Sequence, residues 1–177
     1  IVTELLSQDQ AELVAEYSDM LQIGTRNAQN FQLIIAAAKT GKPVLLKRGM
    51  SMRIMEWLLA GEYVLANRNP NLLFCERGIR TFEDYTRNTL DLSAVAVVKA
   101  ESHCPIVVDP SQGCGKASLV RSMCKGAVAV GADALLVEVH PNPTEAISDA
   151  AQQIDLEGFA ALIDELAPIA ESVGREI

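Results

Sequence analysis

Short apolar runs rich in Val, Ile and Leu recur along this chain, and they alternate with stretches whose apolar residues have helical spacing. The six runs begin near residues 1, 20, 44, 71, 105 and 134. Runs of this kind are typical of strands that are buried on both faces of a parallel sheet. The alternation therefore predicts an α/β fold built from six βα units.

Each run is expected to be followed by a helix. Asn27 and Ser51 are expected to cap the second and third helices, because such side chains accept hydrogen bonds from the free N–H groups of a first helical turn. The expected helices cover residues 8–17, 27–39, 51–65, 86–94, 116–130 and 156–173.

Two arrangements fit six βα units. One is an open doubly wound sheet, and the other is part of a (β/α)8 TIM barrel, which in full needs about 250 residues. The chain has 177 residues, begins at Ile1 inside an apolar run and has no initiator Met. We therefore favour a barrel whose first two units are missing from this sequence, with residues 1–177 forming a single domain.

Composition narrows the range of partners. The net charge of −8 argues against a protein that binds nucleic acid or an anionic membrane in bulk. No apolar run reaches the roughly 18 residues that span a bilayer. The four cysteines form no CxxC pair, so we expect reduced thiols in a cytoplasmic protein.

Charged residues directly follow several of the apolar runs. Charge is costly at the end of a buried strand unless it binds something, and in parallel α/β folds ligands bind at the carboxyl ends of the strands. Cations mixed with carboxylates predict a site for a phosphorylated anion beside a divalent metal, on one rim of the sheet. The residues concerned are Lys47, Arg48, Glu76, Arg77, Arg80, Asp109, Glu138 and Asp149.

Two segments are candidates for binding the anion. Gly24-Thr25-Arg26 joins a strand to a helix start, where backbone N–H groups and an arginine can hold phosphate, although a solvated loop arginine fits the same pattern. Lys47 directly follows Leu46, so it is expected to lie deep in the site, with an exposed Lys47–Arg48 charge pair as the alternative.

A second cluster follows the fourth run. Arg77 and Arg80 can present forked donors to phosphate or carboxylate, and Glu76 can position one of them. A purely structural Glu–Arg network is the alternative for this cluster.

Potential metal ligands gather near the end of the sixth run. Glu138 and His140 are expected on the same face of one strand, with Asp149 in the loop that follows. Carboxylate and imidazole ligands converging in this way could hold Mn²⁺, Fe²⁺ or Zn²⁺. His103 precedes a strand, so it is expected at the opposite rim in a structural role.

At these positions the sequence resembles the type I 3-deoxy-7-phosphoheptulonate (DAHP) synthases, in the β subgroup close to the KDO-8-phosphate synthases. The resemblance covers nearly the whole chain, and its Lys-Arg-Gly-Met and Glu-Arg-Gly-Ile-Arg strings are closer to DAHP synthase than to its KDO relative. The matching segments are 21–27, 42–50, 75–83, 87–92, 108–111, 138–141 and 148–149.

The resemblance implies a (β/α)8 barrel and a transferase. The family condenses phosphoenolpyruvate with erythrose 4-phosphate and releases phosphate, in the first step of the shikimate pathway to aromatic amino acids. It also implies a homo-oligomer. Lys47 is expected to act as an electrostatic clamp, and Glu76 and Asp109 are further catalytic candidates. The residues that match phosphoenolpyruvate contacts are Arg26, Lys47 and Arg77, with Gly24 and Thr25 lending backbone and Glu4 nearby.

The family holds its divalent metal with Cys, His, Glu and Asp. Glu138 and Asp149 match the last two ligands, but Gln112 stands where the family has His, and the Cys belongs to the units that this sequence lacks. Gln is a poorer ligand for a transition metal than imidazole, and His140 is a candidate to compensate.

Three alternatives to DAHP synthesis therefore stay open. A catalytically silent paralogue could bind a phospho-ligand without turnover. A diverged enzyme could use another sugar phosphate, such as arabinose 5-phosphate. A Schiff-base aldolase could use Lys47, because this lysine lies at the end of an expected barrel strand.

Overall fold

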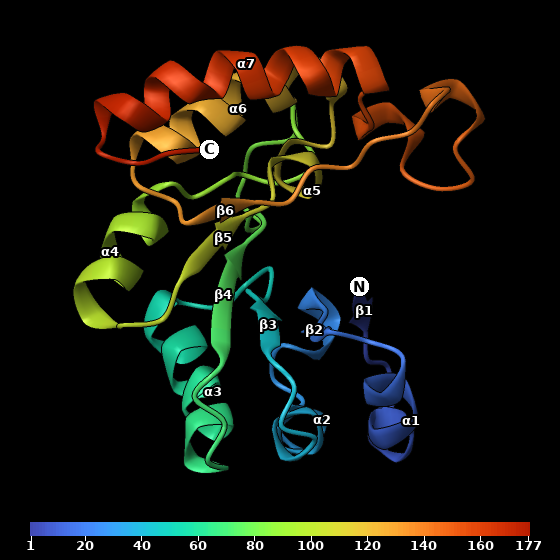
Figure 1. Cartoon of the computed structure of the whole chain (residues 1–177), viewed down its shortest axis with the longest axis vertical. Coiled ribbons are helices and arrows are strands. Elements are labelled where there is room, and N and C mark those ends of the chain that lie inside the picture. Colours follow the sequence, from blue (N-terminus) through green and yellow to red (C-terminus); the bar gives the residue numbers. More distant parts are fainter. The chain divides into compact units, whose positions relative to one another are not determined.

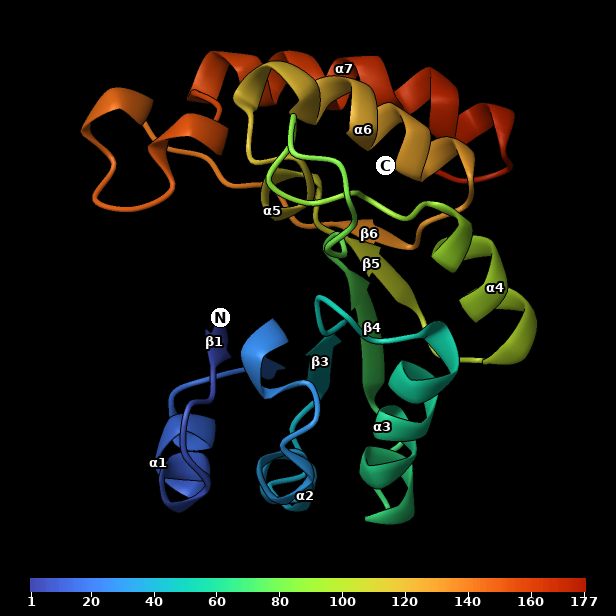
Figure 2. The same ribbon diagram turned by 180° about the vertical axis from the view of Figure 1, so that it is seen from behind.

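The computed structural model describes residues 1–177 and divides into two compact units (Figures 1 and 2). Unit 1 comprises Ile1–Cys75 with Val97–Ile106, and unit 2 comprises Glu76–Ala96 with Val107–Ile177. None of the helices is long and apolar enough to cross a membrane.

Strands alternate with helices along the whole chain, as the hydrophobic pattern predicts. The strands are β1 (Val2–Glu4), β2 (Met20–Ile23), β3 (Val44–Lys47), β4 (Leu72–Glu76), β5 (Ile106–Val108) and β6 (Ala134–Leu135). The α-helices are α1 (Ala11–Glu16), α2 (Phe31–Lys39), α3 (Ile54–Ala66), α4 (Ser93–Glu101), α5 (Pro110–Cys114), α6 (Ala117–Ala129) and α7 (Leu156–Ser172). Single turns of 3-10 helix are η1 (Gln8–Gln10), η2 (Thr25–Asn27), η3 (Pro143–Glu145) and η4 (Ala150–Gln152).

The strand order is that of the sequence, β1-β2-β3-β4-β5-β6. Within unit 1, β1 to β4 pair in parallel, and Lys47 at the end of β3 lies opposite Cys75 in β4. Within unit 2, β5 and β6 pair in parallel. Parallel neighbours joined through helices are the repeating unit of a βα barrel, and the six predicted strands are confirmed.

Close packing of α3 against β4 forms much of the core of unit 1. Trp57 and Phe74 meet edge to face with ring centroids 5.0 Å apart, and the indole of Trp57 donates a hydrogen bond to the carbonyl of Leu46 at 3.1 Å. A Cβ atom on Gly61 would lie only 2.5 Å from Phe74, so glycine lets the helix approach the strand this closely. This contact fixes the helix that follows Lys47.

The core of unit 2 lies beneath α6 and α7, which run side by side in both views (Figures 1 and 2). Apolar side chains at helical spacing on both helices meet there, as their patterns predict. The buried members are Val120, Cys124, Val128, Ile154, Leu162, Leu166 and Ala170.

Both predicted caps are wrong. The N-cap of α2 is Asn30, whose side chain accepts a hydrogen bond from the N–H of Leu33 at 3.2 Å, because the single turn η2 occupies the position around Asn27. The N-cap position of α3 is Arg53 rather than Ser51, and its N–H donates to the side chain of Glu56 at 2.9 Å.

The helix expected over residues 86–94 is also wrong, because α4 begins at Ser93. Residues before it form a loop whose backbone bonds elsewhere. Thr89 pairs with Ile79 in an antiparallel bridge, and the N–H of Arg87 donates to the carbonyl of Cys114 at 3.1 Å. Backbone groups used in this way are not available for a helix, and the loop brings Arg87 beside α5.

Candidate active site

Glu4 and Gly24 lie against each other at the ends of β1 and β2. A Cβ atom on Gly24 would lie 1.9 Å from Oε1 of Glu4, so any larger residue would displace the carboxylate. Thr25 follows in η2, and its hydroxyl donates to the carbonyl of Arg48 at 3.0 Å. The turn after β2 is thereby tied to the end of β3, and Arg26 in the same turn is exposed.

Lys47 and Arg48 are both buried, with exposed fractions of 8% and 4%, so the exposed charge pair is ruled out. Lys47 is the last residue of β3, as predicted. Arg48 donates from Nε to the carbonyl of Met52 at 3.0 Å, and its guanidinium lies 5.9 Å from the ring centre of Trp57. Arg48 is thus held against the core of unit 1, while Lys47 ends the strand.

Glu76 organises the turn that follows β4. It is fully buried, and its carboxylate accepts a hydrogen bond from the N–H of Gly78 at 2.7 Å. Gly78 has a φ of 89°, a left-handed conformation that favours glycine. Arg77 is 5% exposed, whereas Arg80 further along the turn is exposed to solvent.

Asp109 holds the turn after β5, as Glu76 holds the turn after β4. Its buried carboxylate caps the short helix α5 by accepting a hydrogen bond from the N–H of Gln112 at 2.9 Å. The fully buried hydroxyl of Ser111 accepts one from the N–H of Glu138 at 3.0 Å. These bonds position Gln112 and Glu138 relative to each other within unit 2.

Five side chains of unit 2 form a closed ring of hydrogen bonds. Gln112 donates from Nε2 to Oε1 of Glu138 at 2.6 Å and to Oδ2 of Asp149 at 3.1 Å. Gln152 donates from Nε2 to Oε2 of Glu138 at 3.0 Å. Arg87 closes the ring by donating from Nη1 to Oε1 of Gln152 and to Oδ1 of Asp149, each at 2.9 Å.

The ring connects to Arg77 through the oxygen of the Gln112 amide. Nη2 of Arg77 donates to Oε1 of Gln112 at 3.3 Å, and its Nη1 donates to the carbonyl of Gly78 at 3.2 Å. With both guanidinium groups included, the two carboxylates of the cluster are balanced by two positive charges. The structure thus brings together Gln112, Glu138 and Asp149, three of the predicted metal-ligand positions.

His140 has a different environment from these three residues. Its Nδ1 accepts a hydrogen bond from the N–H of Asn142 at 3.0 Å, in its own loop. The expected strand through Glu138 and His140 is shorter than predicted, since β6 ends at Leu135 and is followed by an isolated bridge between Val139 and Ile154. The predicted continuous strand through Glu138 and His140 is therefore wrong.

The donor set does not fit a transition metal. No group of three or more His, Cys, Asp or Glu side chains is arranged to hold one. Between the carboxylates of Glu138 and Asp149 lies the NH₂ group of Gln112, a hydrogen-bond donor without a lone pair to offer a metal.

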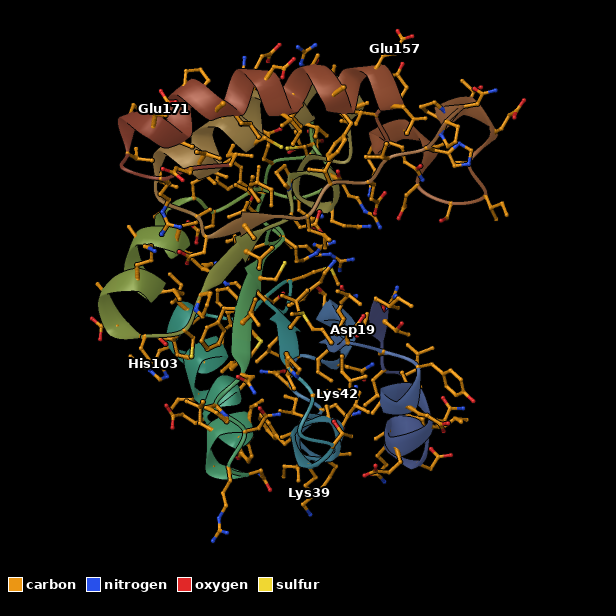
Figure 3. The ribbon with its side chains drawn as sticks, in the orientation of Figure 1. Asp19, Lys39, Lys42, His103, Glu157 and Glu171 are labelled. Atoms are coloured by element: carbon orange, nitrogen blue, oxygen red, sulfur yellow. The ribbon has the colours of Figure 1, made fainter.

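His103 lies in the loop before β5, as expected from the sequence (Figure 3).

Two members of the ring, Arg87 and Gln152, were not among the candidate residues. Arg87 belongs to a segment that carries the family resemblance, so a signal was present, but the wrong helix over 86–94 concealed its position. Gln152 is 2% exposed and follows two alanines in η4, and no local pattern distinguishes it from the neighbouring Gln153.

Two buried thiols lie in unit 2 near α5. Burial raises the pKa of the Cys114 thiol to about 11, and the negative charge of Asp109 adds to the effect. Burial raises the pKa of Cys124 to about 12, with further contributions from Cys114 and Asp109. Both residues are therefore neutral thiols at neutral pH, neither nucleophiles nor thiolate ligands.

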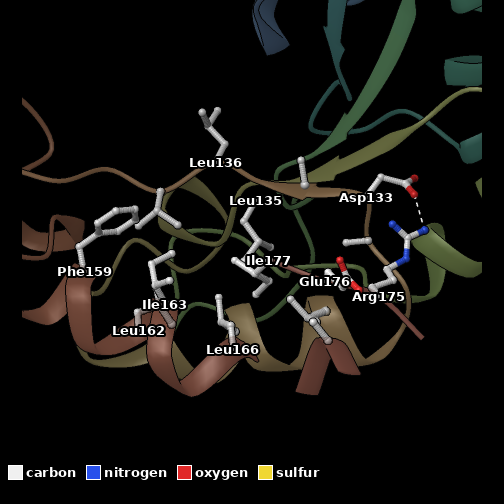
Figure 4. Close-up of a pocket in the computed structure, with 15 residues that line it drawn as sticks. Asp133, Leu135, Leu136, Phe159, Leu162, Ile163, Leu166, Arg175, Glu176 and Ile177 are labelled. Atoms are coloured by element: carbon white, nitrogen blue, oxygen red, sulfur yellow. Dashed lines mark hydrogen bonds and ion pairs between the residues drawn. The ribbon is translucent and has the colours of Figure 1, made fainter. Parts of the chain in front are cut away.

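A separate cavity of about 460 Å³ lies between α7 and the segment 132–137 (Figure 4). Its walls are mainly apolar side chains, such as Leu135, Phe159 and Leu166, and an ion pair between Asp133 and Arg175 lies at one end. The cavity contains none of the ring residues, so it is not the candidate active site.

Known proteins resemble this chain over almost its whole length. It is 50% identical to phospho-2-dehydro-3-deoxyheptonate aldolase of Thermotoga maritima, over 100% of this chain and 52% of that protein. It is 32% identical to 2-dehydro-3-deoxyphosphooctonate aldolase of Syntrophotalea carbinolica, over 96% of this chain and 64% of the relative. The chain thus spans about half the length of the first of these relatives and less than two thirds of the second.

A solved structure has the same fold as this chain. The crystal structure of the Thermotoga maritima aldolase, described as a DAHP synthase, superposes with a TM-score of 0.97 at 50% identity, covering 99% of this chain and 52% of that one. The model of the DAHP synthetase I family matches residues 1–172. The predicted fold class, an α/β chain forming part of a TIM barrel, is confirmed, and the chain belongs to the DAHP synthetase I family.

Proposed function

We propose that the protein condenses phosphoenolpyruvate with erythrose 4-phosphate to give DAHP and phosphate. The observation that carries the proposal is the burial of Lys47 and Arg77 at the ends of β3 and β4 in a chain that is 50% identical to a DAHP synthase. Phosphoenolpyruvate carries a phosphate and a carboxylate, and fixed cations are the groups that bind such an anion.

The family resemblance assigns a set of substrate-binding residues to this chain. They are Glu4, Gly24, Thr25, Arg26, Lys47 and Arg77. In the condensation, C3 of phosphoenolpyruvate bonds to the aldehyde carbon, whose oxygen takes a proton, while water adds at C2 and phosphate leaves. Lys47 and Arg77 would hold the substrate anion, and Glu76 and Asp109 would keep the turn after β4 and α5 in place.

The family resemblance implies a divalent metal such as Mn²⁺, Fe²⁺ or Zn²⁺, but the residues of this chain do not fit one. No step of the proposed reaction is therefore routed through a metal.

Because the four cysteines are free thiols, we also propose a reducing, cytoplasmic location.

The choice of the acceptor sugar phosphate rests on the sequence identity of this chain to two kinds of aldolase. The heptonate aldolase is 50% identical to this chain, whereas the octonate aldolase is 32% identical. We therefore favour erythrose 4-phosphate over arabinose 5-phosphate. A second candidate function, phospho-ligand binding without turnover, is favoured by Gln112, which replaces the histidine that the family uses as a ligand.

The decisive experiment measures phosphate release and loss of phosphoenolpyruvate with each sugar phosphate in turn. We expect turnover with erythrose 4-phosphate and at most slow turnover with arabinose 5-phosphate. Calorimetry should show phosphoenolpyruvate binding in the absence of the sugar, and binding without any turnover would identify the binding-module function. Borohydride should trap no substrate on Lys47, since a stable adduct would identify a Schiff-base aldolase.

A further inference from the structure

We infer that the Gln112 carboxamide takes the position between Glu138 and Asp149 that a metal ion would need, and that the hydrogen-bonded ring replaces the metal in ordering this part of the site. The inference rests on the proposed function for the identity of the substrate. Its central observation is that one NH₂ group donates to both carboxylates, at 2.6 and 3.1 Å.

The orientation of this amide is set by all of its neighbours. Its oxygen faces Nη2 of Arg77, and a guanidinium group has donors but no acceptor. Turning the amide over would place its NH₂ group against those donors and its oxygen against two carboxylates. Three hydrogen bonds would be lost, so the nitrogen is the atom that faces Glu138 and Asp149.

Every carboxylate oxygen of Glu138 and Asp149 already accepts a hydrogen bond within the ring. Glu138 accepts from Gln112 on one oxygen and from Gln152 on the other, and Asp149 accepts from Gln112 and Arg87 in the same way. A cation bridging the two carboxylates would have to displace the amide and break bonds on both sides. The guanidinium of Arg87 already pairs with Asp149 at 2.9 Å, so a dication placed between the carboxylates would also be repelled by a neighbouring positive charge.

Gln112 acts in this arrangement as a positioning residue for Arg77. An imidazole in its place could not donate to both carboxylates and also accept from Arg77, because a neutral ring has one donor and one acceptor. A residue that binds a metal at position 112 needs a lone pair facing the carboxylates, whereas a residue that positions Arg77 needs an acceptor facing the guanidinium. The Gln112 amide has the acceptor for Arg77 but presents no lone pair to a metal.

The test compares the purified protein with its Gln112→His variant, and uses Gln32→His as the matched control because Gln32 is exposed on α2. Calorimetry with Mn²⁺ and with Zn²⁺ should show no stoichiometric site in the parent or the control. Gln112→His should tighten metal binding by at least about 10-fold, the lower end of what even outer ligands of metal sites contribute. The same variant should bind phosphoenolpyruvate more weakly, because Arg77 loses the hydrogen bond from its Nη2 to the Gln112 amide oxygen.

A chelator separates this inference from the proposed function. In the parent, EDTA should change neither the affinity for phosphoenolpyruvate nor any turnover. If the protein never turns over but binds phosphoenolpyruvate equally well with and without EDTA, the condensation proposal fails and the metal-free ring stands. If the parent binds one Mn²⁺ or Zn²⁺ per chain and EDTA lowers its affinity for phosphoenolpyruvate, the inference is overturned.

A second variant covers the case in which Gln112→His does not fold. Gln112→Glu keeps the shape of the side chain but replaces the shared donor by a third carboxylate, so it should gain a site for Mn²⁺. Equal Mn²⁺ affinity in the parent and in Gln112→Glu would show that the amide does not occupy the position, and would overturn the inference.

Discussion

Arg77 and Gln112 are joined by a hydrogen bond of 3.3 Å from Nη2 to Oε1, and the same amide holds Glu138 through its nitrogen at 2.6 Å. The bond connects the turn after β4, where the resemblance assigns a phosphoenolpyruvate contact, to the cluster where it assigns metal ligands. Gln112 thus contacts both of these places directly.

Replacing either buried cation should weaken substrate binding. Arg77→Ala and Lys47→Ala should each reduce the affinity for phosphoenolpyruvate by about 1.5–3 kcal/mol, the range for hydrogen bonds to charged groups. Calorimetry would measure the loss, and Lys39→Ala is the control because Lys39 is an exposed lysine at the end of α2 (Figure 3). Unchanged affinity in both Arg77→Ala and Lys47→Ala would remove these residues from the binding site.

Opening the ring at Gln152 should destabilise the fold. Gln152→Leu keeps the size of a side chain that is 2% exposed but leaves Glu138 and Arg87 each without one partner. Glu138 and Arg87 are only partly buried and can bond to water instead, so the expected loss is about 0.5–1.5 kcal/mol, the net contribution of a hydrogen bond, and denaturant unfolding would measure it. Gln153→Leu is the control, since that amide donates only to the carbonyl of Ser148, at 2.8 Å, in an exposed loop. Equal stability of the two variants would show that the ring contributes nothing to folding.

The strands were predictable because their signal is local. A strand buried on both faces, such as β3, is apolar up to its last residue, so the charge of Lys47 at its end is visible in the sequence without knowledge of its partners. The caps were not predictable in the same way. Asn27 and Asn30 are both capping-type residues, and the choice between them depends on the turn η2, which forms after β2.

In the candidate site, too, some residues can be identified from the sequence alone, whereas others are placed by contacts with residues distant in the sequence. The family resemblance identifies Glu138 and Asp149, and Gln112 stands out because it departs from the family. The ring itself depends on Arg87, which reaches Asp149 because its loop bonds to α5 through contacts distant in sequence. A local helical pattern over 86–94 gave the wrong prediction there, since tertiary hydrogen bonds outweigh a weak helical preference.

Adding a methyl group at Gly61 should destabilise unit 1. The new Cβ would lie 2.5 Å from Phe74 and 2.8 Å from Leu72, so α3 would have to move away from β4. Overpacking of this kind costs about 1–3 kcal/mol, more than the roughly 1 kcal/mol that alanine gains over glycine in a helix. Denaturant unfolding of Gly61→Ala tests this, with Glu62→Ala on the exposed side of α3 as the control. A Gly61→Ala variant as stable as the control would show that the helix has room to shift.

The buried thiols should make the protein less stable at high pH. Their pKa values are raised from 9.0 to about 11 for Cys114 and about 12 for Cys124, so the native state keeps protons that the unfolded chain releases. The stabilising contribution of each thiol is therefore complete below about pH 9 and is lost as the pH rises through the native pKa, at up to about 1.4 kcal/mol per pH unit. Unfolding free energies between about pH 8 and pH 11 would measure the slope. The comparison is with the Cys114→Ala/Cys124→Ala double variant, which keeps every other ionisable group and whose stability should fall less steeply. Parallel slopes for the two proteins would mean that the thiols are not protected from ionisation in the native state.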